Sequence, residues 1–304
     1  MGKFNFFVFI SAILFLTVID DIPSCLASGV DAANAGIKAN GNGDKEKAKV
    51  LFRSALRSNE LSKKNYIIVN NNLCKILWSE SKIYQAIDCY TETLYLSEDN
   101  PWALQSRGAL YNKIGEYENA IEDLSRYILL SPKDDFGYIH RALSLRAIKK
   151  FDKAISDLNK AIKLKPNKSE GYLHRGNTYS KTGNYNLALA DFEKAIAMDP
   201  ESSSVYQAVA WFYATCPERD FRDGTAALKF AEKSMEIEKK NRFNPRLYDT
   251  LAAAYAELGQ FKNAIKAQKQ AIALLKEEKY VDESEYKIRN RLDLYKKGKV
   301  YRAM

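Results

Sequence analysis

The sequence has few of the residues on which catalytic and metal sites are usually built. Its 304 residues include two histidines, four cysteines and seven prolines. No G-x-G-x-x-G, Walker A, G-x-S-x-G, H-E-x-x-H or C-x-x-C motif occurs. We expect His140 and His174 on equivalent neighbouring helices, about 10 Å apart, which is too far to share a metal ion. The sequence therefore predicts no enzyme activity, no metal and no cofactor.

Cysteine is too sparse to indicate a disulfide scaffold. Without Cys25, which lies in the N-terminal segment discussed next, Cys74, Cys89 and Cys216 remain, an odd number. We expect Cys74 and Cys89 to be small buried side chains on the two helices of one hairpin. A disulfide between them is compatible with this placement but is not predicted.

Long apolar stretches are absent except at the N-terminus. Phe4–Ile19 carries no charge, follows Lys3 and precedes a run of small residues that ends at Ser28. This pattern predicts a signal peptide at residues 1–28 and an exported protein, periplasmic or secreted. An uncleaved N-terminal anchor stays open, although the run is shorter than the roughly 20 residues of a spanning helix.

What the sequence does contain is a period of 34 residues between Pro101 and Ser202. Counted from Pro101, each row has a small residue at position 8, an aromatic at 17, Ala at 20 and Pro at 32. The aligned residues are Gly108, Ala142 and Gly176; Tyr117, Phe151 and Tyr185; Ala120, Ala154 and Ala188; Pro132, Pro166 and Pro200. A fixed period of this length indicates a repeat architecture.

Each row has the spacing of two amphipathic helices. In the third row, Tyr172, Gly176 and Tyr179 stand at i, i+4 and i+7, and Ala188, Phe192 and Ala195 repeat this spacing. A helical hairpin of this size cannot bury its own apolar face, so neighbouring hairpins must stack.

This pattern resembles the tetratricopeptide repeat (TPR) family. The resemblance implies an all-α solenoid of about six helical hairpins with a C-terminal capping helix. A capping box of Asp282 and Glu285 is expected at the start of that helix, and the composition of the first row, rich in Gly, Ala and Asn, is compatible with a frayed or disordered hairpin. The array covers residues 29–304, with rows 29–62, 67–100, 101–134, 135–168, 169–202, 203–240 (with an insert at Thr215–Gly224) and 245–278, and the capping helix at 282–297.

Two positions of the row change together. Position 7 is Arg and position 23 is Asp in the three regular rows, whereas apolar residues at position 7 accompany an uncharged position 23. We infer a structural ion pair between the two helices of each hairpin, and an active-site role is disfavoured. The pairs are Arg107 with Asp123, Arg141 with Asp157, and Arg175 with Asp191.

In the TPR family, positions 2, 5, 6, 9 and 13 of the first helix line a concave groove. The resemblance therefore implies a groove whose residues are unusually apolar, and an exposed apolar strip usually marks an interaction site. Packing of the two tryptophans between repeats is the alternative. The groove residues are Trp102, Gln105, Phe136, Ile139, His140, Leu143, Leu173, His174, Asn177 and Trp211.

These observations lead to one main functional hypothesis and one alternative. The main hypothesis is a non-catalytic protein–protein interaction scaffold of a bacterial cell envelope, which binds a peptide or helix of an unidentified protein in the groove. The net charge is +9, and 18 Lys and Arg stand against 11 Asp and Glu in residues 229–304. The alternative is therefore a secreted or membrane-anchored adaptor whose basic C-terminal quarter holds an anionic membrane or an acidic polymer. No nucleic-acid motif is present.

Overall fold

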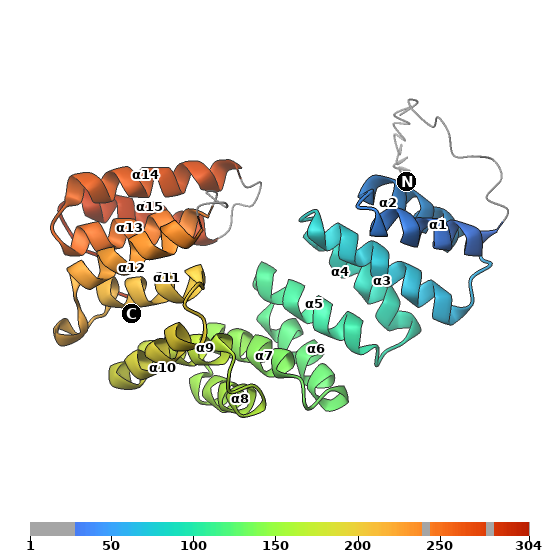
Figure 1. The fold of residues 1–304 in the computed structure, drawn as a ribbon, viewed down its shortest axis with the longest axis horizontal. Helices are drawn as coiled ribbons and strands as arrows, with labels where there is room; N and C mark the ends of the chain where they lie inside the picture. Colours follow the sequence, from blue (N-terminus) through green and yellow to red (C-terminus); the bar gives the residue numbers. More distant parts are fainter. Residues whose placement is uncertain (1–27, 239–243, 278–282, 304) are drawn as a thin grey trace, which may run out of the picture. The chain divides into compact units, whose positions relative to one another are not determined.

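The computed structural model describes residues 28–238, 244–277 and 283–303, and all regular secondary structure in these residues is helical (Figure 1). The predicted signal peptide lies outside the described residues except for Ser28, whose side chain caps the first helix. Among the described helices, none combines the length and the apolar character needed to cross a bilayer.

The chain divides into two compact units, Met1–Cys89 and Tyr90–Met304, and the division falls within one helix. The N-terminal unit contains α1 (Gly29–Gly41), α2 (Lys45–Arg57), α3 (Lys63–Ser79) and the first half of α4 (Ile83–Leu96).

The first hairpin, α1 with α2, is fully formed. Ser28 and Asp44 cap the two helices with their side chains. Gly36 lets the helices approach closely, because a Cβ there would lie 2.6 Å from the ring of Phe52, which is completely buried. A frayed or disordered first hairpin, which its composition left open, is therefore not observed. The described residues hold seven helix pairs, as many as the predicted rows, rather than about six.

A disulfide joins Cys74 of α3 to Cys89 of α4, which the sequence did not predict. The two Cα atoms are 5.5 Å apart, within the range that a disulfide requires. The cause is the hairpin geometry, since positions 8 and 23 of one row lie opposite each other across the pair. Cys216 is free and buried, and burial raises the pKa of its thiol.

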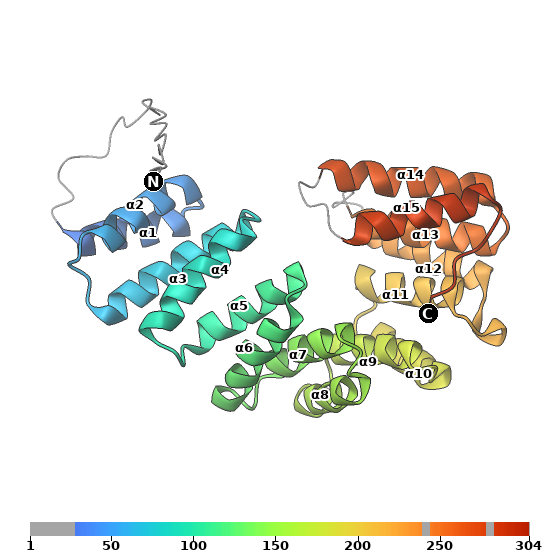
Figure 2. The same ribbon diagram turned by 180° about the vertical axis from the view of Figure 1, so that it is seen from behind.

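The C-terminal unit continues the series of helix pairs. The second half of α4 is followed by α5 (Pro101–Ile114), α6 (Tyr117–Leu130), α7 (Asp135–Ala147), α8 (Phe151–Leu164), α9 (Ser169–Lys181), α10 (Tyr185–Met198), α11 (Ser203–Thr215), α12 (Gly224–Ile237), α13 (Pro245–Glu257), α14 (Phe261–Glu277) and α15 (Glu283–Lys296). Figure 2 shows α15 lying along α14, where the sequence placed the capping helix. The predicted capping box of Asp282 and Glu285 lies outside the described side chains.

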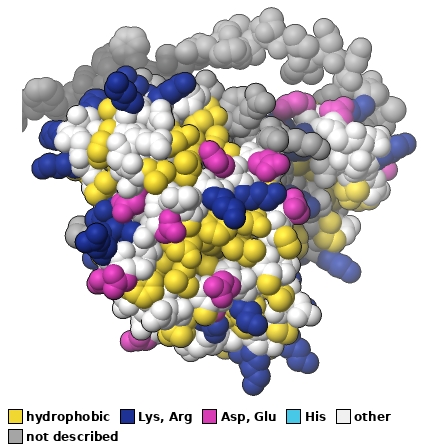
Figure 3. Space-filling model, turned by 60° about the vertical axis from the view of Figure 1, so that its left-hand side comes forward, with side chains coloured by type: hydrophobic (Ala, Val, Ile, Leu, Met, Phe, Trp, Pro, Cys, Tyr) yellow, Lys and Arg dark blue, Asp and Glu magenta, His cyan; other side chains and the backbone are white. Residues whose placement is uncertain are grey.

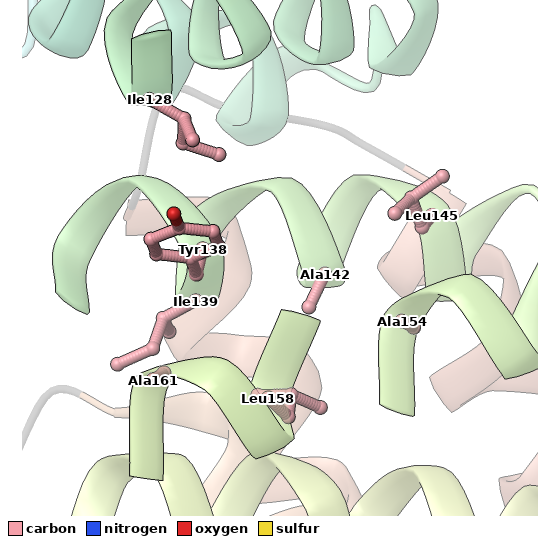
Figure 4. Close-up of a cluster of buried hydrophobic side chains, with 8 residues drawn as sticks. All are labelled: Ile128, Tyr138, Ile139, Ala142, Leu145, Ala154, Leu158 and Ala161. Atoms are coloured by element: carbon pink, nitrogen blue, oxygen red, sulfur yellow. The ribbon is translucent and has the colours of Figure 1, made fainter. Parts of the chain in front are cut away.

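Small and large apolar residues on facing helices together form the core of a row. In the second regular row, Ile139 and Ala142 of α7 point toward Leu158 and Ala161 of α8 (Figure 4). Ile128 of the preceding helix α6 packs on the same cluster. Each hairpin thus completes its core with its neighbour, as stacked repeats require.

The predicted insert between α11 and α12 is a packed loop. It contains a short 3₁₀-helix, Arg219–Phe221, whose Phe221 ring lies 5.2 Å from that of Tyr185. Arg222 donates hydrogen bonds to the carbonyl oxygens of Cys216 and Pro217 and to the carboxylate of Glu257. The backbone N–H of Asp223 donates to the carbonyl oxygen of Tyr213 in α11, so the insert is fixed to both α11 and α13.

Candidate functional site

The three predicted ion pairs are brought together in the structure. Each position-7 arginine donates two hydrogen bonds, from Nε and Nη2, to the position-23 aspartate of its own hairpin, at 2.7–2.8 Å. The aspartates are buried. This two-fold geometry is the strong form of the interaction, so the six residues hold the scaffold together.

Each of these arginines makes a further hydrogen bond that the comparison of the rows with one another did not predict. Its Nη1 reaches position 25 of the preceding row, where Thr91, Ser125 and Asn159 accept from Arg107, Arg141 and Arg175 in turn. The arginines therefore join consecutive rows as well as the two helices of one row.

Of the ten predicted groove residues, two belong to the core instead. Ile139 and Leu173, both at position 5, are only 2% and 7% exposed. They pack against the second helix of their own hairpin or its neighbours, so a ligand cannot reach them. Trp102 is 50% exposed, and Gln105, Phe136, His140, Leu143, His174, Asn177 and Trp211 are partly exposed.

Trp211 is covered by the C-terminal segment of the chain. The guanidinium of Arg291 lies 5.2 Å from the ring centroids of both Trp211 and Tyr301. The same guanidinium donates to the carboxylate of Asp249, which also accepts from Gln268. Trp211 is thus engaged within the protein, as its alternative interpretation had it, and the described structure offers no support for a ligand role.

Phe136, His140 and Leu143 remain as a connected group on α7. The rings of Phe136 and His140 stack with centroids 3.9 Å apart. Burial lowers the pKa of His140 to about 4. His174 on α9 has a pKa of about 3, lowered by burial and then by the charge of Arg146. Both histidines are therefore neutral at pH 7.

The two histidines show no sign of a metal site. The described residues contain no group of three or more His, Cys, Asp or Glu side chains arranged to hold an ion. The Nδ1 atoms of both histidines are buried without a hydrogen-bond partner among the described residues. Their backbone carbonyl oxygens accept hydrogen bonds from the preceding row: Asn112 donates to that of His140, and Arg146 donates to that of His174.

A cavity of about 830 Å³ opens beside His140 and Leu143. Apolar residues such as Tyr117 and Phe151 form part of its wall. Among the described side chains, no Asp or Glu lines the cavity, whereas six cationic side chains do. They are Lys113, Arg146, Lys149, Lys181, Arg246 and Lys287. We call this site the basic cavity.

Sequence reasoning could have found part of the basic cavity. Lys113 and Lys181 stand at position 13, one of the positions that line the groove in the family, but the apolar strip directed attention elsewhere. Arg246 and Lys287 belong to α13 and α15, outside the regular rows, and no periodic signal links them to α7 or α9.

The comparisons with known proteins agree with the repeat pattern. Two tetratricopeptide repeat models match, one over residues 137–276 and one over residues 103–134. Together they cover more than half of the chain. A search of curated proteins returned no match.

Solved structures match in fold. A tetratricopeptide repeat protein from Parabacteroides merdae is 19% identical, with 89% of this chain and 99% of that chain aligned at a TM-score of 0.68. MamA from Desulfovibrio magneticus is also 19% identical, with 57% of this chain and 95% of that chain aligned at a TM-score of 0.53. At this identity the two structures support the fold alone.

Proposed function

Because the chain belongs to the tetratricopeptide repeat family, we propose that it is a non-catalytic scaffold that binds a peptide or helix of a partner protein on the surface of α7, in a bacterial cell envelope. A tetratricopeptide repeat fold implies protein–protein interaction, and proteins of this family are generally scaffolds rather than enzymes. The site and the compartment are the parts that we add.

The observation that carries the proposal is the connected surface of Phe136, His140 and Leu143. All three side chains are partly exposed, and the last two line a cavity large enough for part of a peptide. Peptides and helices commonly bind in such apolar grooves. Figure 3 shows that hydrophobic side chains also gather over a broad area of the surface, and such areas usually mark interaction sites.

The disulfide supports the proposed location of the protein in the cell envelope. Disulfides form and persist in oxidising compartments such as the bacterial periplasm, and Cys74 and Cys89 are bonded here. Together with the signal-peptide pattern at residues 1–28, this favours export. Thiol labelling and N-terminal sequencing of protein from the native cells test it: bonded cysteines and a new N-terminus near Ser28 are expected, whereas free thiols and an intact N-terminus would contradict export.

Partner capture from envelope extract tests the binding surface. The wild-type protein is expected to retain a partner that Phe136→Glu combined with Leu143→Glu loses, because two charges would be placed in the apolar surface. The matched control is Leu129→Glu with Leu187→Glu, since these leucines are 81% and 50% exposed and do not line the cavity. Retention of every partner by the first variant, with unchanged melting temperature, would refute the proposed surface.

A further inference from the structure

The second helix of the second regular row differs in charge from the equivalent helices beside it. Residues 149–168, which contain α8 and parts of the turns that flank it, include seven Lys and two Asp. In the equivalent segments 115–134 and 183–202, acidic residues outnumber basic ones by five to two and by four to one. The repeat forms the same hairpin at all three places, so the fold does not require this reversal of charge.

Part of this positive charge lies at an open hollow of about 590 Å³ between two consecutive turns. Lys165 lines the hollow from the turn after α8. Leu130, at the end of α6, and Lys133, in the turn that follows it, line the other side. The structure thus brings lysines of two rows to one place, next to an apolar side chain.

The carboxylates close to these lysines are already engaged. Asp134, the only acidic residue among the described residues that line the hollow, accepts a hydrogen bond from the hydroxyl of Tyr127 and caps α7. Asp135 is buried and binds Lys168. Three exposed lysines make no ion pair among the described residues: Lys133, Lys163 and Lys165.

Apolar side chains project from the same edge of the array. Leu129 is 81% exposed, and Leu130 beside it is exposed as well. Leu129 occupies the same position in its row as Lys163 does in the next row and as Tyr95 does in the row before. Tyr95 is 87% exposed. Equivalent positions on stacked helices lie about 10 Å apart, so apolar and cationic side chains alternate with little space between them. We call Tyr95, Leu129, Leu130, Lys133, Lys163 and Lys165 the turn surface.

We propose that the turn surface docks on an anionic membrane, with its lysines at the lipid phosphates and Leu129 at the boundary between headgroups and acyl chains. Protruding apolar side chains beside lysines fit such a boundary. A soluble phosphate would use the lysines but not Leu129. The inference goes beyond the proposed function, and it places membrane contact in the regular rows rather than in the basic C-terminal quarter.

The acidic residues of α6 lie too far along the helix to prevent this contact. Glu118 and Glu122 belong to the first half of α6, whereas Leu129 is next to its last residue. The helix carries them about 10–16 Å away from Leu129, and the Debye length at physiological ionic strength is about 8 Å. Their repulsion of an anionic surface is therefore largely screened at the turn.

Co-sedimentation with lipid vesicles tests the inference. The protein used begins at Ser28, because this form retains every described helix and the cap of α1. It lacks Phe4–Ile19, an apolar stretch that would bind lipid by itself. Mixed vesicles of phosphatidylglycerol and phosphatidylcholine are expected to bind the protein more tightly than vesicles of phosphatidylcholine alone, and added salt should reduce the difference.

A matched pair of double variants locates the cationic contact. Lys163→Gln with Lys165→Gln should weaken binding to the mixed vesicles about tenfold or more, since one lysine near an anionic membrane contributes about fivefold. The control, Lys229→Gln with Lys262→Gln, removes the same charge at exposed positions of the C-terminal quarter. Its affinity should stay within about twofold of wild type.

A second pair tests the apolar contact. Leu129→Gln should weaken binding to the mixed vesicles about fivefold or more, because less apolar area is buried in the membrane. Leu187→Gln is the control, since Leu187 is also an exposed leucine but lies on α10, outside the turn surface. All substituted side chains are exposed, so every variant should keep the wild-type melting temperature.

Four outcomes would overturn the inference. The first is equal binding to mixed and to phosphatidylcholine vesicles. The second is equal weakening by the control lysines, which would assign binding to the C-terminal quarter. The third is full binding by Leu129→Gln together with competition by inorganic phosphate, which would indicate a soluble anion. The fourth is capture of an acidic protein that depends on Lys163 and Lys165 while vesicles do not bind. Partner capture that depends on Phe136 and Leu143 would leave the scaffold proposal standing in each case.

Discussion

The regular rows and the C-terminal end of the larger unit use the same chemical pair in different ways. In the rows, each arginine binds an aspartate 16 residues away, and the side chains remain partly accessible at the arginine end. At the end, Asp249 of α13 binds Arg291 of α15 across 42 residues, and both are 9% exposed. The rows thus repeat a local contact, whereas the end depends on one contact made once.

The difference follows from the position of each ion pair in the array of hairpins. A row is covered on both sides by similar rows, so its ion pair links elements that would stack in any case. In the described residues, the last hairpin is followed by the single helix α15 in place of a further hairpin. Terminal repeats need such a cap, and the neighbouring rings of Trp211 and Tyr301, each 5.2 Å from the guanidinium of Arg291, shield its attachment point from water.

The largest loss in the free energy of unfolding is expected when the carboxylate of Asp249, at the C-terminal end, is removed. Asp249→Ala leaves Arg291 and Gln268 without their buried partner, and the loss of one member of a buried pair costs about 3–5 kcal/mol. Urea unfolding measures it. The control is Asp293→Ala on α15, an exposed carboxylate paired with Lys296, for which almost no change is expected. A loss below about 1 kcal/mol for Asp249→Ala would refute the inference that the C-terminal end depends on the contact of Asp249 with Arg291.

A smaller effect is expected in a regular row. Asp157→Ala should cost about 2–3 kcal/mol, because Arg141 is left without its counter-ion but keeps some access to water. The double variant Arg141→Leu with Asp157→Ala should recover part of this loss, since no charge is left unpaired. Equal unfolding free energies for the single and the double variant would show that the ion pair does not matter in this way.

The smallest effect per residue on the free energy of unfolding is expected from acid, through His140 and His174 of the regular rows. The pKa values of His140 and His174 are about 4 and about 3 in the folded protein, against about 6.5 in an unfolded chain. Between these values the unfolded chain binds more protons, so the free energy of unfolding falls as the pH drops from 6.5 toward 4. About 1–2 kcal/mol per histidine is expected at pH 5.

A double variant isolates that effect. His140→Gln with His174→Gln should lose the part of the pH dependence that lies between pH 6.5 and 5, measured by urea unfolding at both values. If the variant and the wild type lose the same stability over this interval, other groups are responsible, and the histidines titrate normally.

The contrast between the regular rows and the C-terminal end also separates the contacts that could be predicted from the sequence from those that could not. The helices, their order and the pairing of Arg141 with Asp157 follow from residues that recur every 34 positions, because the rows can be compared with one another. The contact of Asp249 with Arg291 occurs once and spans 42 residues, so no second row reveals it. The basic cavity is an intermediate case: Lys181 lies at a groove position of the family, but Lys287 comes from the cap.

Two groove residues were placed wrongly and one disulfide was not predicted, each for a specific structural reason. Ile139 and Leu173 were assigned to the groove by family position, yet each carries a large apolar side chain that fills the hairpin core instead. The disulfide was not predicted because the N-terminal rows lack the Arg–Asp pair from which the facing positions were inferred; Cys89 occupies one of these positions and Cys74 lies next to the other.

The contacts between rows have a consequence for protein engineering. Arg141 reaches back to Ser125, and Arg175 reaches back to Asn159. If residues 135–168 were excised as one unit, Arg175 would face the hydroxyl that Arg141 uses now, and Asn112 would meet the carbonyl of His174 in place of that of His140. Both of these donors would find an oxygen acceptor at the new junction, so the chain should tolerate being shortened, or lengthened by a copied segment, in whole steps of this size.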